Sequence, residues 1–155
     1  SNREEGKISI GSIILFILIG ILGIAIILPS FLSQGIKNKN SEGKSFLGAT
    51  IRAQQAYRLE ATQFAPSFTD LKIGLPTQTA NYIFRITSAD KESTTVEAIS
   101  LYPELKSFAG KVITDKKNGT KAMACQTTAP SNIPPIPDPA TQTCHYRDNV
   151  PNYPD

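Results

Sequence analysis

The feature that most constrains this chain is a long run without a charged side chain, residues 8–36, between Lys7 and Lys37. Within it, residues 8–28 contain ten Ile, four Leu and one Phe, separated only by Gly, Ser and Ala. As a helix, these 21 residues are apolar on every face and span about 31 Å, close to a bilayer core of about 30 Å. The sequence therefore predicts a transmembrane helix at residues 8–28, after a polar flank at residues 1–7.

Two other interpretations of this run are weaker. The apolar region of a removable signal peptide covers about 7–15 residues and ends in an A-x-A-like site. Residues 8–28 are longer, and Ser33-Gln34-Gly35 is a poor cleavage site, so we expect the segment to be retained. A buried core helix is the second alternative, but a domain of this size could hardly surround a helix that is apolar on all sides.

Three glycines of the predicted span, Gly11, Gly20 and Gly23, form a small-residue face. Such a face suits close packing against helices of other membrane proteins. The alternative is that lipid merely tolerates them. Membrane lipid and other membrane-protein subunits are thus the expected partners.

The two cysteines, Cys125 and Cys144, flank a proline-rich stretch near the C-terminus. One disulfide in an oxidising compartment fits this arrangement, and it would stabilise the fold by about 3 kcal/mol. Two free thiols in a cytosolic domain are the alternative. Because charges flank the apolar run on both sides, they do not fix its orientation. The disulfide argument places the N-terminus in the cytoplasm and the remaining chain outside it.

Beyond the apolar run, the sequence predicts a helix that continues to about residue 65, with its weakest order between Pro29 and Gly43. Helical spacing gives it two apolar stripes. The first is predicted to pack on a sheet and consists of Phe46, Ala49, Ala53, Ala56 and Tyr57. The second, Leu47 and Ile51, is free to contact another chain, unless it belongs to one wide core face.

Strand-like alternation replaces the helical period after residue 76. The pattern predicts about four antiparallel strands, at residues 81–87, 93–101, 111–115 and 121–126, with a tight turn at Asn118-Gly119. An irregular piece at residues 103–108 precedes the third strand. A helix on such a sheet is a two-layer α+β domain, which we assign to residues 29–155. The proline-rich tail is expected to be an extended surface loop.

The residues that enzymes and cofactor sites require are scarce here. The single histidine, His145, follows a cysteine that is predicted to be bonded, so a Cys-His pair or a zinc site is not expected. No nucleotide-binding, metalloprotease or haem-attachment motif is present. A net charge of +3 gives nucleic-acid binding no support, and Arg52 and Arg58 read as a solvated helix flank. We therefore predict a non-enzymatic protein without a cofactor or a metal.

Several segments together resemble a known family. Gly20–Gln34 is similar to the end of the N-terminal helix of type IV pilins and pseudopilins. Arg52–Glu60, Phe64-Ala65 and Leu75–Tyr82 look like the pilin-like proteins of the G/H type, found mainly in cyanobacteria. The resemblance implies one long N-terminal helix, half in the membrane and half packed on an antiparallel sheet, and a disulfide-closed C-terminal loop.

The chain departs from this family at the start of the apolar run. Pilin precursors carry a leader that ends in Gly, followed by a start whose Glu guides filament assembly. Here Lys7 follows Gly6, and the family spacing places Gly11 or Ser12 where that Glu stands. The departure favours a resident subunit of a membrane complex, such as a photosynthetic one, over a minor pilin or pseudopilin of a pilus or type II secretion system. A DNA- or ligand-binding module is the less favoured class.

The resemblance and the cysteines together predict a location. We expect a single-pass protein of a bacterial membrane, with its globular domain in the periplasm, the thylakoid lumen or the cell exterior.

Overall fold

The computed structural model describes residues 9–117 and 119–146, and within α1 it leaves out the side chains of residues 25–30 and 32. The predicted flank at residues 1–7 and Asn118 of the predicted turn lie outside the described residues. The chain divides into two compact units, residues 1–37 and residues 38–155. Each unit is described by itself.

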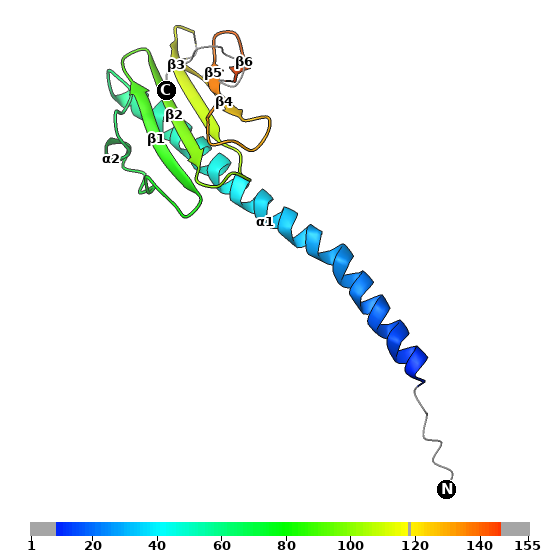
Figure 1. The fold of residues 1–155 in the computed structure, drawn as a ribbon. Coiled ribbons are helices and arrows are strands. Elements are labelled where there is room, and N and C mark those ends of the chain that lie inside the picture. Colours follow the sequence, from blue (N-terminus) through cyan, green and yellow to red (C-terminus); the bar gives the residue numbers. More distant parts are fainter. Residues whose placement is uncertain (1–8, 118, 147–155) are drawn as a thin grey trace. The chain divides into compact units, whose positions relative to one another are not determined.

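The element order begins with helices and continues with strands (Figure 1). The helices are α1 (Ile10–Glu60) and α2 (Phe68–Leu71). The strands are β1 (Tyr82–Ala89), β2 (Ser93–Ser100), β3 (Phe108–Asp115), β4 (Gly119–Gln126), β5 (Ile136–Asp138) and β6 (Thr143–His145). The fold is therefore α+β, with an N-terminal helix and an antiparallel sheet of four strands, as predicted.

Helix α1 passes through the stretch where the sequence predicted its weakest order. Pro29, Gly35 and Gly43 all lie within its bounds, and the helix is not interrupted at any of them. In the second unit, the neighbouring sheet supplies an explanation, because tertiary contacts hold the turn around Gly43 despite the low helix propensity of glycine. At Gly35, in the first unit, an added Cβ would meet nothing within 4 Å.

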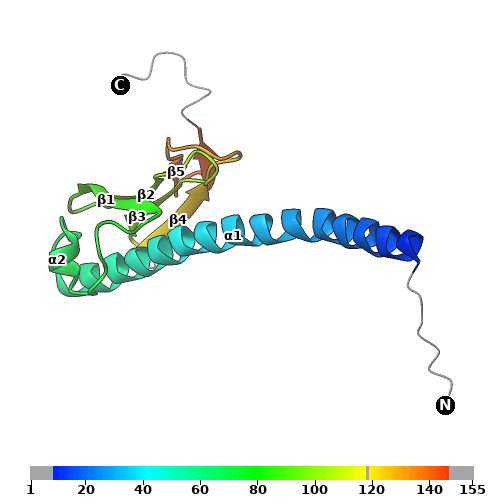
Figure 2. The same cartoon turned by 60° about the horizontal axis from the view of Figure 1, so that its bottom comes forward.

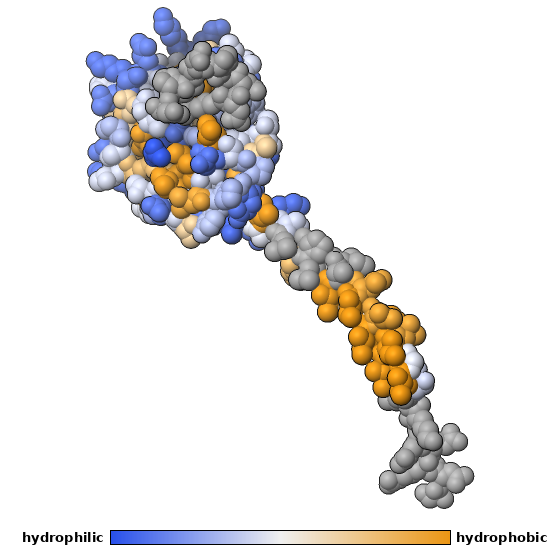
Figure 3. All heavy atoms as spheres, in the orientation of Figure 1, coloured by the Kyte–Doolittle hydropathy of each residue, from blue (hydrophilic) through white to orange (hydrophobic). Residues whose placement is uncertain are grey.

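In the first unit, the described apolar side chains of α1 are exposed. Their exposed fractions lie between 45% for Ile13 and 77% for Ile10 over residues 10–24. Figure 3 shows these side chains as an apolar surface along the helix. Across the described residues, no helix combines the length and the apolarity that a membrane span needs.

The four-stranded sheet is an antiparallel meander in the order β1-β2-β3-β4. Its hairpin registers follow chain order, with a β-bulge in β1 between Ile86 and Ser88. Strand β3 begins at Phe108 rather than at the predicted Lys111, since residues 108–110 pair with β4. The turn into β4 starts from Asp115, which is the register partner of Gly119, and Gly119 adopts a positive φ of 78°.

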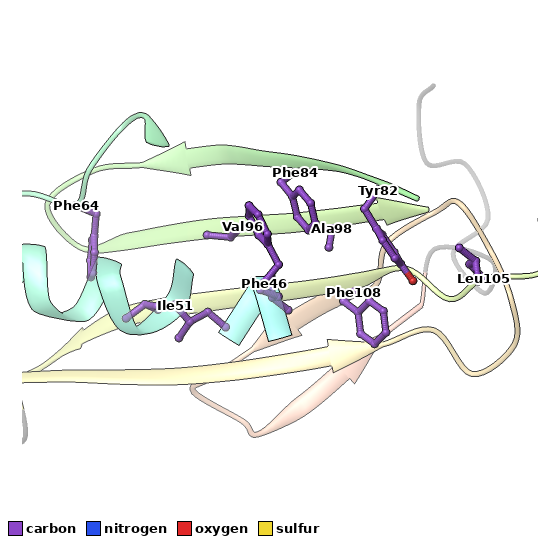
Figure 4. Close-up of a cluster of buried hydrophobic side chains, with 11 residues drawn as sticks. Phe46, Ile51, Phe64, Tyr82, Phe84, Val96, Ala98, Leu105 and Phe108 are labelled. Atoms are coloured by element: carbon purple, nitrogen blue, oxygen red, sulfur yellow. The ribbon is translucent and has the colours of Figure 1, made fainter. Parts of the chain in front are cut away.

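The hydrophobic core lies between the sheet and the part of α1 in the second unit (Figure 4). Alternate residues of β1 and β2 point toward the helix, because side chains alternate between the two faces of a strand. Phe46 of α1 stacks on Phe84 of β1, with ring centroids 3.5 Å apart. The remaining members of the cluster are Leu47, Ile51, Phe64, Tyr82, Val96, Ala98, Leu105, Phe108 and Val112.

The burial of Leu47 and Ile51 corrects the prediction of a stripe that is free to contact another chain. Leu47 is 1% exposed and Ile51 is 8% exposed, and both belong to the core. Opposite them, β3 carries Gly110, whose missing side chain leaves room for the ends of both residues. Leu47 and Ile51 therefore belong to the core face of α1, which was the alternative interpretation of this stripe.

The predicted sheet-packing stripe is only partly turned toward the sheet. Phe46 is in the core, whereas Ala49, Ala53 and Tyr57 are half-buried and Ala56 is exposed. The true packing face is rotated toward Leu47, and it includes the fully buried polar residues Thr50 and Gln54. Helical periodicity found the helix, but it ranked small alanines above these polar positions because it scores apolarity alone.

The proline-rich tail corrects the prediction of a surface loop. Residues 134, 135, 137 and 139, all prolines, are buried, and the tail forms a second sheet in which β5 pairs with β6. Strand β5 lies against β3 and β4 on the side of the sheet away from α1 (Figure 2). The sheet residues on that side include Ala109 and Cys125, which are 0% and 4% exposed. Their small side chains allow the tail to approach closely.

The predicted disulfide is present. Cys125 of β4 is bonded to Cys144 of β6, with a Cα–Cα distance of 5.9 Å. This bond closes the tail onto the sheet across a sequence separation of 19 residues. The described residues contain no free cysteine.

Candidate functional site

The predicted helix-packing glycines lie in the first unit. A Cβ added at Gly20 or Gly23 would meet nothing within 4 Å, and one at Gly11 would meet only Ser9 Oγ at 3.6 Å. Each of the three glycines therefore has room beside it for a side chain or for a neighbouring group, on a helix whose other side chains are mostly apolar. Their role as a face for partner helices stays a prediction.

At the beginning of the second unit, Tyr82 of β1 joins α1 to the sheet. We call Tyr82 and its contacts with Asn40, Gly43 and Lys106 the clamp. The single hydroxyl proton of Tyr82 is shared between two acceptors, Lys106 O at 3.0 Å and Asn40 Oδ1 at 3.2 Å, and Lys106 N donates to the same Asn40 oxygen at 2.9 Å. The Tyr82 ring lies against Gly43, where any Cβ would stand 2.7 Å from Tyr82 Cζ. Gly43 is thus required for a close approach of ring and helix.

The pKa of Tyr82 is raised to about 12, mainly because the hydroxyl is buried and to a smaller extent because the Glu42 carboxylate is nearby. Glu42 is itself bonded to the residue just before β1, since Asn81 Nδ2 donates to Glu42 Oε2 at 2.7 Å. The clamp is therefore built from uncharged hydrogen-bonding groups, with one carboxylate at its edge.

The other end of the packed helix is held by polar contacts to the loop that follows it. The side-chain amide of Gln54 donates to Ala65 O at 2.8 Å and accepts from Ala65 N at 2.9 Å, with both residues fully buried. Arg58 Nη1 donates to Ala61 O, its Nε donates to Lys91 O, and its guanidinium lies over the Phe64 ring. Arg58 is thus engaged in joining the helix end to two loops.

Three residues of the predicted sheet-packing stripe line a groove instead. Ala53, Ala56 and Tyr57 face the segment at residues 69–73 across a groove of about 560 Å³. Phe46, from the same stripe, meets Phe68 of α2 edge to face, with ring centroids 6.1 Å apart. The stripe therefore belongs partly to the contact between α1 and the α2 segment, which the sequence did not reveal because α2 has only four residues.

A further group of exposed side chains was not found from the sequence. Leu101, Tyr102 and Ile133 are 40%, 43% and 44% exposed. Leu101 and Tyr102 directly follow β2, where the alternation of apolar and polar residues stops. Two adjacent apolar residues at the end of a strand were the sequence signal that could have indicated an exposed apolar site. Ile133 lies in the tail, and no local pattern connects it with the other two.

The chemistry-bearing residues do not converge. His145 Nε2 is 3.1 Å from Thr143 Oγ1, and its neighbour Cys144 is in the disulfide. Within residues 9–117 and 119–146, no group of three or more His, Cys, Asp or Glu side chains is placed to hold a metal ion. The features that can carry a function are accordingly surfaces: the apolar helix, the α1–α2 groove and the exposed end loops.

A helix packed on a four-stranded antiparallel meander, with a disulfide that closes the C-terminal segment onto the sheet, defines a pilin-like domain. The model of the family described as type IV pilin-like G and H matches residues 40–146. The chain belongs to this family, and it is a type IV pilin-like structural protein. A comparison with curated proteins gives no match.

Proposed function

We propose that the protein is a non-enzymatic subunit of a membrane-associated assembly, anchored by residues 8–28 and acting through protein contacts. The exposure of apolar side chains along residues 10–24 of α1 carries this proposal. Each such side chain near the centre of a bilayer favours insertion by about 0.3–0.6 kcal/mol. Membership of the pilin-like family supports assembly with further subunits.

Two assemblies are open to such a subunit. The family favours a pilus or secretion machine, in which the protein would be a minor pilin or pseudopilin. The sequence favours a resident of another membrane complex, for example a photosynthetic one, because residues 8–41 contain no carboxylate to register subunits in a filament. In either case Gly11, Gly20 and Gly23 would offer the close-packing face to a partner helix.

Membrane anchoring is tested by extraction of the full chain from membranes at alkaline pH. We expect it to stay with the membranes, and Ile17→Arg to lower the fraction that stays, since Arg at a span centre costs about 2.5–3.5 kcal/mol, a large part of the summed contribution of the apolar side chains. Gln34→Arg is the matched control, because Gln34 lies past the predicted span. Release of the unmodified chain by alkaline washing would contradict anchoring.

The contact function is tested by mild purification from native membranes. We expect the protein to copurify with other subunits, and their identity separates the two assemblies. Pilus or secretion components would support the filament-related role, whereas a pigment-bearing complex would support residence there. Recovery as a monomer only, without crosslinking, would contradict a role in either.

The proposed location of the domain is outside the cytoplasm, in the periplasm, the thylakoid lumen or the cell exterior, with the N-terminus in the cytoplasm. The Cys125–Cys144 disulfide supports it, because such bonds persist in oxidising compartments. In cells lysed in the presence of a thiol reagent, we expect labelling of both cysteines only after reduction. Labelling before reduction would contradict this location.

A further inference from the structure

Exposed apolar side chains of the second unit concentrate at one end of it. Among its described residues, four large hydrophobic side chains are exposed: Leu59, Leu101, Tyr102 and Ile133. Leu59 lies in the last turn of α1, near the Phe64 end of the core. Figure 4 shows Tyr82, Phe108 and Leu105 at the opposite end of the core. The other exposed residues are connected to that end through the backbone, beginning with Leu101 N, which donates to Asn81 O at 2.9 Å.

Backbone hydrogen bonds bring these three residues to the same place. Leu105 N donates to Tyr102 O at 3.1 Å, which forms a turn after β2, and Ser131 N donates to Leu105 O at 3.0 Å. Ile133 follows this anchored serine by two residues, and Ile133 N donates to Ser131 Oγ at 3.1 Å. The two loops therefore present their apolar side chains at one end of the domain.

Buried hydroxyl groups fix this arrangement. Ser107 is fully buried, and its Oγ donates to Ser131 O at 2.6 Å. Ser100 Oγ donates to the same carbonyl at 3.1 Å. Because one carbonyl is held by two buried hydroxyls, the tail segment that carries Ile133 is joined firmly to the loop that carries Leu101 and Tyr102.

Two lysines belong to this end of the domain. Lys39 Nζ lies 5.1 Å from the centre of the Tyr102 ring, and Lys106, held by Asn40, is half-buried beside the same loop. Glu104 is exposed on that loop and balances part of the charge. Tyr has an apolar ring with a polar hydroxyl, and Lys has an apolar stem with a charged end. Both side chains suit the boundary between an apolar and a polar environment.

From this we propose that the end of the domain formed by Leu101, Tyr102 and Ile133, with Lys39 and Lys106, rests in the lipid headgroup layer of the membrane. The proposal rests on the anchoring proposed above. Lys39 follows residue 28 by eleven residues, so a fully extended chain could separate the two by no more than about 40 Å. Since Glu104 offsets one of the two lysine charges, the net charge of this end is small, and we expect it to recognise the amphipathic character of the headgroup layer rather than its net charge.

The absence of tryptophan from the chain allows a direct test. Single tryptophans are placed by Tyr102→Trp and, as a matched control at the other end of the domain, by Leu59→Trp. The full chain is reconstituted into phosphatidylcholine vesicles that contain a lipid with a shallow nitroxide quencher. We expect the Tyr102→Trp emission to be quenched at least twofold more than that of Leu59→Trp, and to be protected from iodide in the aqueous phase.

A second variant, Ile133→Trp, keeps the test decisive if Tyr102→Trp fails to fold, which circular dichroism would detect. Equal quenching of the end-loop and Leu59 tryptophans, in protein that resists alkaline extraction, would overturn this inference and leave the anchoring intact. Loss of the protein from the vesicles on alkaline washing would instead contradict the anchoring itself. We also expect the same quenching in vesicles with added phosphatidylglycerol, and quenching that depends on the anionic lipid would overturn recognition by amphipathic character.

Discussion

The two parts of helix α1 have the same backbone conformation but differ in the polarity and the burial of their side chains. In residues 10–24 the side chains are apolar on all sides and exposed, with no charged residue among them. In residues 38–60 only one side is buried, and it mixes Leu47 and Ile51 with the polar residues Thr50 and Gln54. The exposed side of this second part carries charged residues, for example Lys44, Arg52 and Glu60.

This difference shows which interactions each part depends on. The second part is stabilised by one sheet, through shape and through hydrogen bonds to buried polar groups. The first part has no partner on any side within the described residues of its own unit. Its apolar side chains are spread over every face of the helix, whereas the second part buries a single face.

The largest difference between the two parts is expected for truncation of a leucine. Leu47→Ala should lower the free energy of unfolding of the domain by about 2–5 kcal/mol, because it opens a cavity in the core. Leu18→Ala, on the exposed part of the same helix, should leave it unchanged. Denaturant unfolding of both full-length variants in detergent, followed by circular dichroism, measures the difference. Similar losses in the two variants would contradict the comparison.

A smaller effect is expected where glycine is required for contact. Gly43→Ala should lower the free energy of unfolding by about 1–3 kcal/mol, because the new methyl group would stand 2.7 Å from Tyr82 Cζ and the buried Tyr82 ring, whose hydroxyl is hydrogen-bonded, would have to shift. Gly35→Ala meets nothing within 4 Å, so it should cause no loss and at most a gain of about 1 kcal/mol. Thermal unfolding compares the two. A stabilising Gly43→Ala would show that the ring and the helix are not in close contact.

A third effect, confined to alkaline pH, is expected at the Tyr82 hydroxyl. The folded state raises the pKa of Tyr82 from 10.0 to about 12, so it binds the hydroxyl proton more tightly than the unfolded chain does. This contribution is complete below pH 10 and should be lost as the pH rises from 10 to 12. Tyr82→Phe should reduce the slope of unfolding free energy against pH in that window. An unchanged slope would exclude Tyr82 as its source.

Much of the fold could be predicted because its signals are local. Alternating residues indicated the four strands, and the two cysteines indicated the disulfide. The partners of each helical face could not be predicted in the same way. Leu47 and Ile51 resemble a free apolar stripe until Gly110, about sixty residues away, is known to lie opposite them.

The tail illustrates the same limit. Its prolines favour an extended backbone, and proline-rich segments usually lie on the surface. They are buried here because Ala109 and Cys125 leave a shallow region on the sheet and the disulfide holds the tail against it. Burial of this kind depends on a second surface that is distant in sequence, which no local pattern encodes.

By itself the sequence determined the uncharged apolar run, the α+β architecture and the cysteine pair, because periodicity, charge and cysteine spacing are properties of neighbouring residues. The tertiary structure alone decided which side of α1 meets the sheet, how the tail covers the opposite side, and that Tyr102 and Ile133 share one end of the domain. These outcomes depend on the fit between surfaces far apart in the chain. Close packing selects one such fit, and a residue's own preferences do not.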